Sequence, residues 1–148
     1  MKLVIEGGKG QVIDSVNRDV TVPDFTSVTM SFATPKVYRV KTIPELKAIK
    51  SDPGALPTTD REFSRSDRLY IRADAYAPGN ATPTVTARLL NRGGQSMADL
   101  PVQTQPGHPA EIELPLSSFA AGEYLIELNA KSEGGSTAQE LIAFRVSR

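Results

Sequence analysis

Short runs in which apolar and polar residues alternate cover most of this chain, and glycine or proline interrupts them. The clearest run, at residues 67–76, places Leu69, Ile71 and Ala73 on one side and polar residues on the other. Such alternation is typical of a β-strand with one buried face. Further runs lie at residues 3–6, 11–22, 28–33, 36–41, 84–91, 96–103, 110–114, 124–130 and 142–146. The pattern predicts an all-β antiparallel sandwich, immunoglobulin- or fibronectin-III-like, of roughly eight to ten strands.

Residues 7–10, Gly-Gly-Lys-Gly, separate the first two alternating runs. Glycine supplies the positive φ angles that a tight reversal needs, so we expect a β-hairpin here. A phosphate-binding loop would need Gly-x-x-x-x-Gly-Lys-Ser/Thr followed by a helix, and neither feature is present.

One short helix is predicted near residues 43–50. Thr42 and Glu45 have the spacing of a capping box, in which each side chain bonds backbone N–H groups at the start of a helix. Ile43, Leu46 and Ile49 then form one apolar face, and the sequence Ser-Asp-Pro-Gly at residues 51–54 ends the helix. We expect loop from there to about residue 66.

Tyr124 follows a corner at residues 117–122 and opens a predicted strand. In β-sandwiches a tyrosine at this position forms a tyrosine corner, in which its hydroxyl bonds the backbone a few residues upstream. We therefore expect the Tyr124 ring in the core and its hydroxyl on the preceding corner.

The length of 148 residues suits a single module spanning residues 1–148. The core sandwich is expected at about 36–148. Residues 1–33 are either strands of the same sandwich or strands that continue from a preceding module.

Charge and composition exclude several function classes. Lys plus Arg and Asp plus Glu number 17 each, so the chain lacks the broad basic field of a nucleic-acid-binding protein. It has no Cys and one His, which excludes thiolate nucleophiles and thiolate metal sites. No apolar run is long enough to span a membrane, and residues 1–8 contain no secretory signal peptide.

Candidate chemistry in the sequence is sparse. His108 lies in the loop sequence Pro-Gly-His-Pro without a nearby serine elbow, so we interpret it as an exposed loop residue. Two acidic pairs, Asp52 with Asp60 and Asp67 with Asp74, lack the spacing of a calcium loop. We therefore predict no catalytic residue, no metal site, no cofactor and no enzyme activity.

The polar side of the strand at residues 67–76 is the preferred contact surface. It carries Arg68, Tyr70, Arg72 and Tyr76, and arginine and tyrosine are common at protein interfaces. Acidic residues interleave with these arginines, so a salt-paired outer strand face is the alternative interpretation.

Several segments resemble the C-terminal, β-rich region of bacterial, notably acidobacterial, von Willebrand factor type A-related proteins. The resemblance covers most of the chain, at residues 22–25, 34–35, 61–76, 83–94, 114–116, 122–127 and 143–146. The Asp-x-Ser-x-Ser adhesion motif of the type A domain itself is absent. The resemblance implies part of an exported protein, in an extracytoplasmic location.

These observations together predict a non-catalytic accessory module that binds a protein or acts as a structural spacer. Its partner is expected to be another module of the same chain or an envelope protein, without nucleic acid or membrane insertion, and the oligomeric state stays open. A carbohydrate-binding module is the main alternative, although the chain has no Trp for stacking sugars. A hydrolase using His108 is a remote one.

Overall fold

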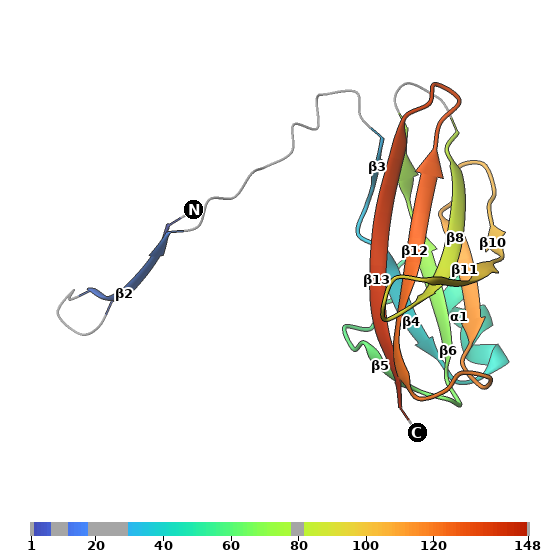
Figure 1. The fold of residues 1–148 in the computed structure, drawn as a ribbon, viewed down its shortest axis with the longest axis horizontal. Helices are drawn as coiled ribbons and strands as arrows, with labels where there is room; N and C mark the ends of the chain where they lie inside the picture. Colours follow the sequence, from blue (N-terminus) through green and yellow to red (C-terminus); the bar gives the residue numbers. More distant parts are fainter. Residues whose placement is uncertain (1, 7–11, 18–29, 78–81, 148) are drawn as a thin grey trace.

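The structure, a computed structural model, describes the backbone of residues 2–6, 12–17, 30–77 and 82–147, and the side chains of the last two ranges. Figure 1 shows the strands and the helix in these ranges. In chain order the elements are β1 (Lys2–Glu6), β2 (Val12–Asn17), β3 (Ser31–Phe32), β4 (Lys36–Val40), α1 (Ile43–Ser51), β5 (Glu62–Ser64), β6 (Arg68–Ala73), β7 (Ala75–Tyr76), β8 (Thr84–Asn91), β9 (Ser96–Leu100), β10 (Val102–Gln103), β11 (Ala110–Pro115), β12 (Gly122–Lys131) and β13 (Thr137–Ser147).

Two main sheets face each other. One has the strand order β10-β11-β6-β4, and the other has the order β5-β13-β12-β8-β9. Their strands pair antiparallel, except that β5 runs parallel to β13. The predicted all-β antiparallel sandwich with one short helix is therefore confirmed (Figure 1).

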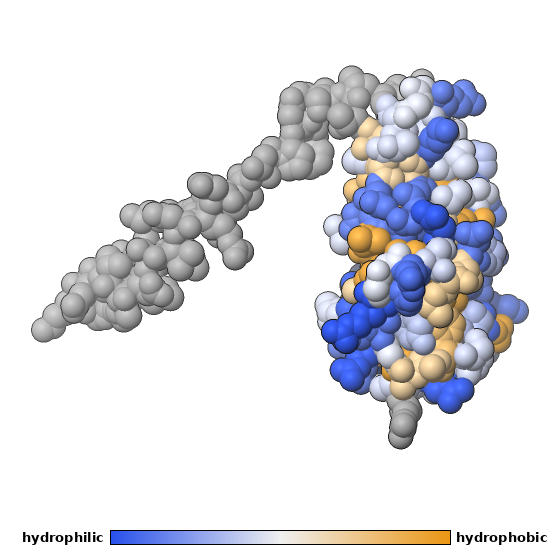
Figure 2. Space-filling view, in the orientation of Figure 1, coloured by the Kyte–Doolittle hydropathy of each residue, from blue (hydrophilic) through white to orange (hydrophobic). Residues whose placement is uncertain are grey.

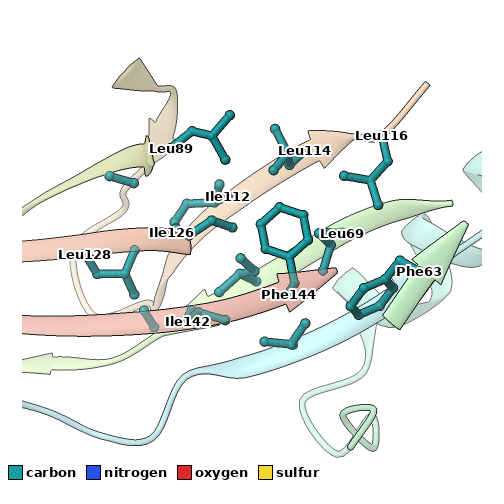
Figure 3. Close-up of a cluster of buried hydrophobic side chains, with 14 of the residues drawn as sticks. Phe63, Leu69, Leu89, Ile112, Leu114, Leu116, Ile126, Leu128, Ile142 and Phe144 are labelled. Carbon is teal, nitrogen blue, oxygen red and sulfur yellow. The ribbon is translucent and has the colours of Figure 1, made fainter. Parts of the chain in front are cut away.

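The main core lies between the two sheets. Figure 3 shows side chains of both sheets pointing toward one another, with Leu69 and Ile112 from the first sheet and Ile126 from the second. All three are fully buried, and burying such a side chain stabilises the fold by about 1.5–3 kcal/mol. The period-two pattern therefore identified the inward faces of β6 and β12 correctly.

Strand β12 begins with the expected tyrosine corner. The Tyr124 hydroxyl donates a hydrogen bond to the carbonyl oxygen of Ala120, at 3.0 Å. The Tyr124 ring lies 5.1 Å from the Phe119 ring and 5.6 Å from the Phe144 ring, centroid to centroid. These contacts hold the corner against the end of the core.

Helix α1 also forms as predicted. The Thr42 Oγ1 accepts a hydrogen bond from the Glu45 N–H at 3.3 Å. The Glu45 carboxylate accepts one at 2.7 Å, but from the N–H of Lys41 rather than from that of Thr42. The helix ends at Ser51, and the Asp52 N–H bonds the carbonyl of Ile49. No helix in the described ranges is long and apolar enough to cross a bilayer.

The predicted strand at residues 96–103 is two strands in different sheets. Strand β9 pairs with β8, and β10 pairs with β11. Pro101 separates them, and proline has no N–H to donate to a ladder. The chain therefore crosses from one sheet to the other at Pro101.

The prediction of a loop at residues 62–64 is wrong. They form β5, whose Phe63 is fully buried and packs edge-on against Phe144. The Ser147 hydroxyl also donates to the Phe63 carbonyl at 3.2 Å. A strand of three residues is too short to show an alternating pattern, and a distant strand, β13, holds it in place.

Strands β1 and β2 pair antiparallel, as the predicted hairpin requires. The glycine-rich turn at residues 7–10 lies outside the described residues, as do residues 18–22 and 28–29 of the two predicted strands. Strand β3 pairs with β7. Two alternatives for residues 1–33 both stay predictions: strands of the same sandwich, or strands that continue from a preceding module.

Candidate functional site

The predicted contact face is covered by the protein's own helix. Tyr70 and Arg72 do point away from the main core, but their exposed fractions are only 0% and 7%. Arg68 is partly exposed, and Tyr76 is 58% exposed on the separate strand β7. The four residues therefore do not form one exposed surface, and a contact with a partner through them stays a prediction.

A second, smaller core explains this burial. Leu46 of α1 packs with Tyr38 and Val40 of β4 and with Tyr70 of β6. The Tyr38 and Tyr70 rings lie 5.6 Å apart, and the Tyr38 hydroxyl donates to the carbonyl of Ala55 at 3.3 Å. A tyrosine can be buried when its hydroxyl has a hydrogen-bond partner. Alternation counted Tyr70 as a polar residue of an exposed face, so it did not reveal that both faces of β6 are covered.

Arg72 links this sheet to the end of α1. Its guanidinium donates to the backbone carbonyls of Ile49 at 2.6 Å, Lys50 at 3.1 Å and Asp52 at 3.1 Å. It also lies over the Tyr38 and Tyr70 rings, 5.5 Å and 5.4 Å from their centroids. Carbonyls at a helix C-terminus lack partners within the helix and carry partial negative charge. Arg72 therefore stabilises the docked helix.

Ion pairs occupy the rest of this face. The Lys50 Nζ lies 2.7 Å from a Glu113 oxygen and 3.3 Å from a Glu111 oxygen, and Arg68 lies 3.2 Å from Glu113. The hydrogen bond with Glu113 is the main cause that raises the pKa of Lys50. Burial, together with the neighbouring Glu111 carboxylate, raises the pKa of Tyr70 to about 12. These contacts match the alternative interpretation of a salt-paired outer face.

The outer face of the five-stranded sheet is different. Along β13 the outward residues at 139, 141, 143 and 145 are all exposed. Leu141 is 52% exposed and Met97 is 55% exposed. By alternation along β9, Met97 lies on the same side of the sheet as Asp99, which pairs with Arg88. On the face turned to the viewer in Figure 2, hydrophobic side chains lie among hydrophilic ones over β12 and β13. We call Met97 and Leu141 the apolar pair, although β8 and β12 separate the strands on which they lie.

A charged network on β12 and β8 lies between the two residues of the apolar pair. The Arg88 guanidinium is 2.6 Å from a Glu127 oxygen, and Gln139 donates to the other oxygen of the same carboxylate. Glu127 is 9% exposed, so its charge is held by partners on two neighbouring strands. This network leaves Glu127 with little capacity for another ligand.

The same face contains a cavity of about 300 Å³. Its floor includes Leu125 of β12 and Ala143 of β13, which are direct cross-strand partners. Three arginines, Arg61, Arg92 and Arg145, line it together with Glu123, and Tyr124 and Phe144 are also among its lining residues. We call it the arginine cavity. The arginine cavity was not predicted from the sequence, because its residues come from four separate segments.

A larger cavity, of about 600 Å³, lies where β7, β8 and the β10–β11 loop meet. Asp74, Tyr76 and His108, which the sequence analysis considered separately, all line it. His108 is exposed, as expected for a loop residue, and its N–H bonds the carbonyl of Gln105. We call it the end cavity.

The acidic residues considered for calcium have other neighbours. Asp67 is 6% exposed, accepts a hydrogen bond from the Ser64 N–H at 2.9 Å and lies 3.5 Å from Arg39. Asp60 lies 3.4 Å from the same arginine. The Asp52 carboxylate accepts a hydrogen bond from the Gly54 N–H at 2.8 Å. Among the described residues, no group of three or more His, Asp or Glu could hold a metal ion.

Comparison with known proteins adds one structural similarity. The sequence matches no protein-family model and has no significant match among curated proteins. Among solved structures, the chain is similar to CopC from Methylosinus trichosporium OB3b, at 17% sequence identity and a TM-score of 0.42. The match covers 61% of this chain and 85% of CopC. This similarity is too low to transfer a ligand or an activity.

Proposed function

We propose that this chain is a non-catalytic module of an exported bacterial protein, and that it contacts another protein through the outer face of its five-stranded sheet. The observation that carries the proposal is the contrast between the two outer faces. Helix α1 covers the one with Tyr70 and Arg72, whereas the other exposes Leu141 and Met97. The extracytoplasmic location rests on the sequence resemblance to von Willebrand factor type A-related proteins.

The composition of the exposed face supports a protein partner. Protein interfaces are enriched in Met and Arg. Here Leu141 on β13 and Met97 on β9 lie on either side of Arg88 and Glu127, and the Glu127 charge is already neutralised by Arg88 and hydrogen-bonded by Gln139. Binding a partner would bury the apolar pair without leaving that carboxylate unpaired.

Site-specific photo-cross-linking tests this proposal. A photoreactive phenylalanine analogue replaces Leu141 in one variant and Lys47 in the control, where Lys47 is an exposed residue of α1 on the opposite side of the sandwich. In an envelope extract of the source organism, we expect a defined protein adduct at position 141 and none at position 47.

Adding Met97→Lys to the first variant should then weaken the adduct, because it places a charge on the same face, at the edge strand β9. A lack of adduct at 141 would favour the structural spacer, which needs no contact at this face. Adducts of equal yield at both positions would mean non-specific contact and would contradict the proposed face.

A second candidate function is carbohydrate binding at the end cavity. The buried Tyr70 cannot form a sugar platform with Tyr76, which removes the pair that the sequence suggested. Tyr76 alone is still exposed beside Asp74, Gln105 and His108. One aromatic ring next to polar side chains is a suitable arrangement for a sugar, which has an apolar face and hydroxyl groups.

Retention in polysaccharide affinity gels tests the second candidate. Tyr76→Ala should lose any retention that the parent shows, and Met97→Ala, on the outer face of the five-stranded sheet and outside the lining of the end cavity, should keep it. Equal retention of parent and Tyr76→Ala would end the carbohydrate hypothesis for this cavity.

The hydrolase alternative needs His108 to contact a carboxylate and a hydroxyl group. In the described part of the chain, no hydrogen bond joins the His108 side chain to either kind of group, although Asp74 and Thr104 line the same cavity. Assays with generic ester and peptide substrates test it directly. Activity that His108→Ala abolishes would contradict the proposed non-catalytic role.

A further inference from the structure

The arginine cavity has an unequal balance of charge. Three arginines line it against one glutamate, although the chain as a whole has a formal net charge of zero. Arg92 is already paired, with its Nε 3.2 Å from a Glu123 oxygen. Within the described ranges, Arg61 and Arg145 have no carboxylate partner. The cavity therefore has two guanidinium groups available for an anion.

The backbone brings these two arginines together. The Arg145 N–H donates to the Arg61 carbonyl at 2.7 Å, so the segment before β5 lies directly beside β13. One nitrogen of the Arg61 guanidinium, Nη1, donates to the carbonyls of Thr58 and Asp60, both at 3.0 Å. These bonds fix the orientation of Arg61 and leave its other N–H groups free to bind. A pre-oriented guanidinium loses less entropy when it binds a carboxylate.

The floor of the cavity is apolar and well supported. Leu125 and Ala143 lie side by side on the outward face of β12 and β13. Beneath them, the Tyr124 and Phe144 rings stack at 5.6 Å, and the hydroxyl of Tyr124 is tied to Ala120. A rigid apolar floor next to charged groups favours a ligand that has both kinds of surface.

We propose that the arginine cavity binds a small organic carboxylate whose apolar body, an aryl ring or a short acyl chain, lies on Leu125 and Ala143. The carboxylate accepts hydrogen bonds from Arg61 and Arg145, since a guanidinium matches a carboxylate in geometry and charge. A volume of about 300 Å³ limits the ligand to one ring or one short chain. This ligand-binding role goes beyond the proposed protein contact and does not depend on it.

The class of ligand can be tested with three probes in NMR titrations of the ¹⁵N-labelled chain. The probes are 4-phenylbutyrate, its neutral counterpart 4-phenylbutan-1-ol, and acetate, which has the charge without the ring. We expect saturable shifts of the amides of Leu125, Ala143 and Arg145 with 4-phenylbutyrate. The alcohol and acetate should each bind at least about tenfold more weakly than 4-phenylbutyrate, because each lacks one half of the interaction.

Variants identify the residues that bind. Arg145→Gln should weaken 4-phenylbutyrate binding about tenfold, and Ala143→Glu, which places a like charge on the floor, should abolish it. Lys47→Gln removes one positive charge from the exposed side of α1 and is the matched control, with unchanged affinity expected. The amide spectrum of each variant without ligand shows whether the fold is kept, so a misfolded Arg145→Gln would be replaced by Arg61→Gln.

Three results would overturn the proposal. They are no saturable shift with 4-phenylbutyrate, equal affinity for the alcohol, and shifts that map outside the cavity.

A peptide ending in Phe with a free carboxylate, compared with its amide, distinguishes the source of the ligand. Tighter binding of the free-acid peptide than of 4-phenylbutyrate would assign the carboxylate to a polypeptide terminus, and the reverse order to a free acid. Both results keep the ligand class, and neither depends on the cross-linking result at Leu141.

Discussion

Arg72 donates a hydrogen bond from its Nε to the hydroxyl of Tyr70, 3.0 Å away, and both side chains lie beneath helix α1. The rest of the Arg72 guanidinium binds carbonyls at the end of the helix. A pair that resembles an exposed interaction surface in the sequence therefore fastens the only described helix to the four-stranded sheet.

Arg72→Met should destabilise the fold by about 2 kcal/mol or more, because it removes the charge-assisted hydrogen bonds from the guanidinium to the carbonyls of Ile49, Lys50 and Asp52. The free energy of unfolding from urea titrations measures the loss. Hydrogen exchange should show the loss concentrated in α1. Arg68→Met, which removes a half-exposed ion pair with Glu113, is the control and should cost less than about 1 kcal/mol. Equal losses for the two variants would contradict the role of Arg72.

Tyr70 predicts a loss of stability at alkaline pH. Its pKa is raised from 10.0 to about 12 in the folded protein, mainly by burial. The unfolded chain therefore releases this proton at lower pH than the folded one. The contribution of Tyr70 is complete below about pH 10 and is lost as the pH rises through the folded pKa of about 12.

Urea titrations at several values from about pH 8 to about pH 11 measure this dependence. Tyr70→Phe should reduce the fall in unfolding free energy above about pH 10, since it removes the titrating group. It should also cost about 1 kcal/mol at neutral pH, because the Arg72 Nε loses its acceptor. The same alkaline slope in the parent and in Tyr70→Phe would show that Tyr70 does not cause the loss.

The tyrosine corner predicts a specific effect of one hydroxyl. Tyr124→Phe keeps the ring contacts with Phe119 and Phe144 and removes the hydrogen bond to Ala120. We expect a loss of about 1 kcal/mol in the free energy of unfolding. Tyr76→Phe, at an exposed ring, is the matched control and should leave stability unchanged. No difference between the two variants would mean that the corner bond adds nothing.

The division of the chain predicts the behaviour of a fragment. The strands that face each other across the main core, from β4 to β13, all lie after residue 35. A fragment of residues 30–148 should therefore unfold cooperatively. The midpoint of its thermal unfolding should lie within ~2–4 °C of that of the full chain. At this chain length, such a shift corresponds to about 1 kcal/mol in the free energy of unfolding. A fragment that fails to fold would place residues 1–29 within the same structural unit, which differential scanning calorimetry of both proteins decides.

Local sequence patterns were sufficient to predict those elements and contacts that depend on residues close together in the chain. Alternation identified the inward face of β6, because side chains along a strand point to opposite sides in turn. The spacing of Thr42 and Glu45 located the start of α1, and Tyr124 after its corner predicted the bond to Ala120. Each of these interactions spans at most four residues, so the chain encodes it without reference to the rest of the fold.

Contacts between distant segments were not readable in the same way. The pairing of β5 with β13, the crossing between sheets at Pro101 and the burial of Tyr70 under α1 all depend on which segments meet. Alternation defines the two faces of a strand, but it does not say what covers them or which strand lies alongside. The arginine cavity shows the same limit, since Arg61, Arg92 and Arg145 become neighbours only when β5 pairs with β13, β13 with β12 and β12 with β8. The longer strands and their inward faces thus follow from the sequence, whereas β5, the break between β9 and β10, the exposed surface and with it the candidate site follow from tertiary packing.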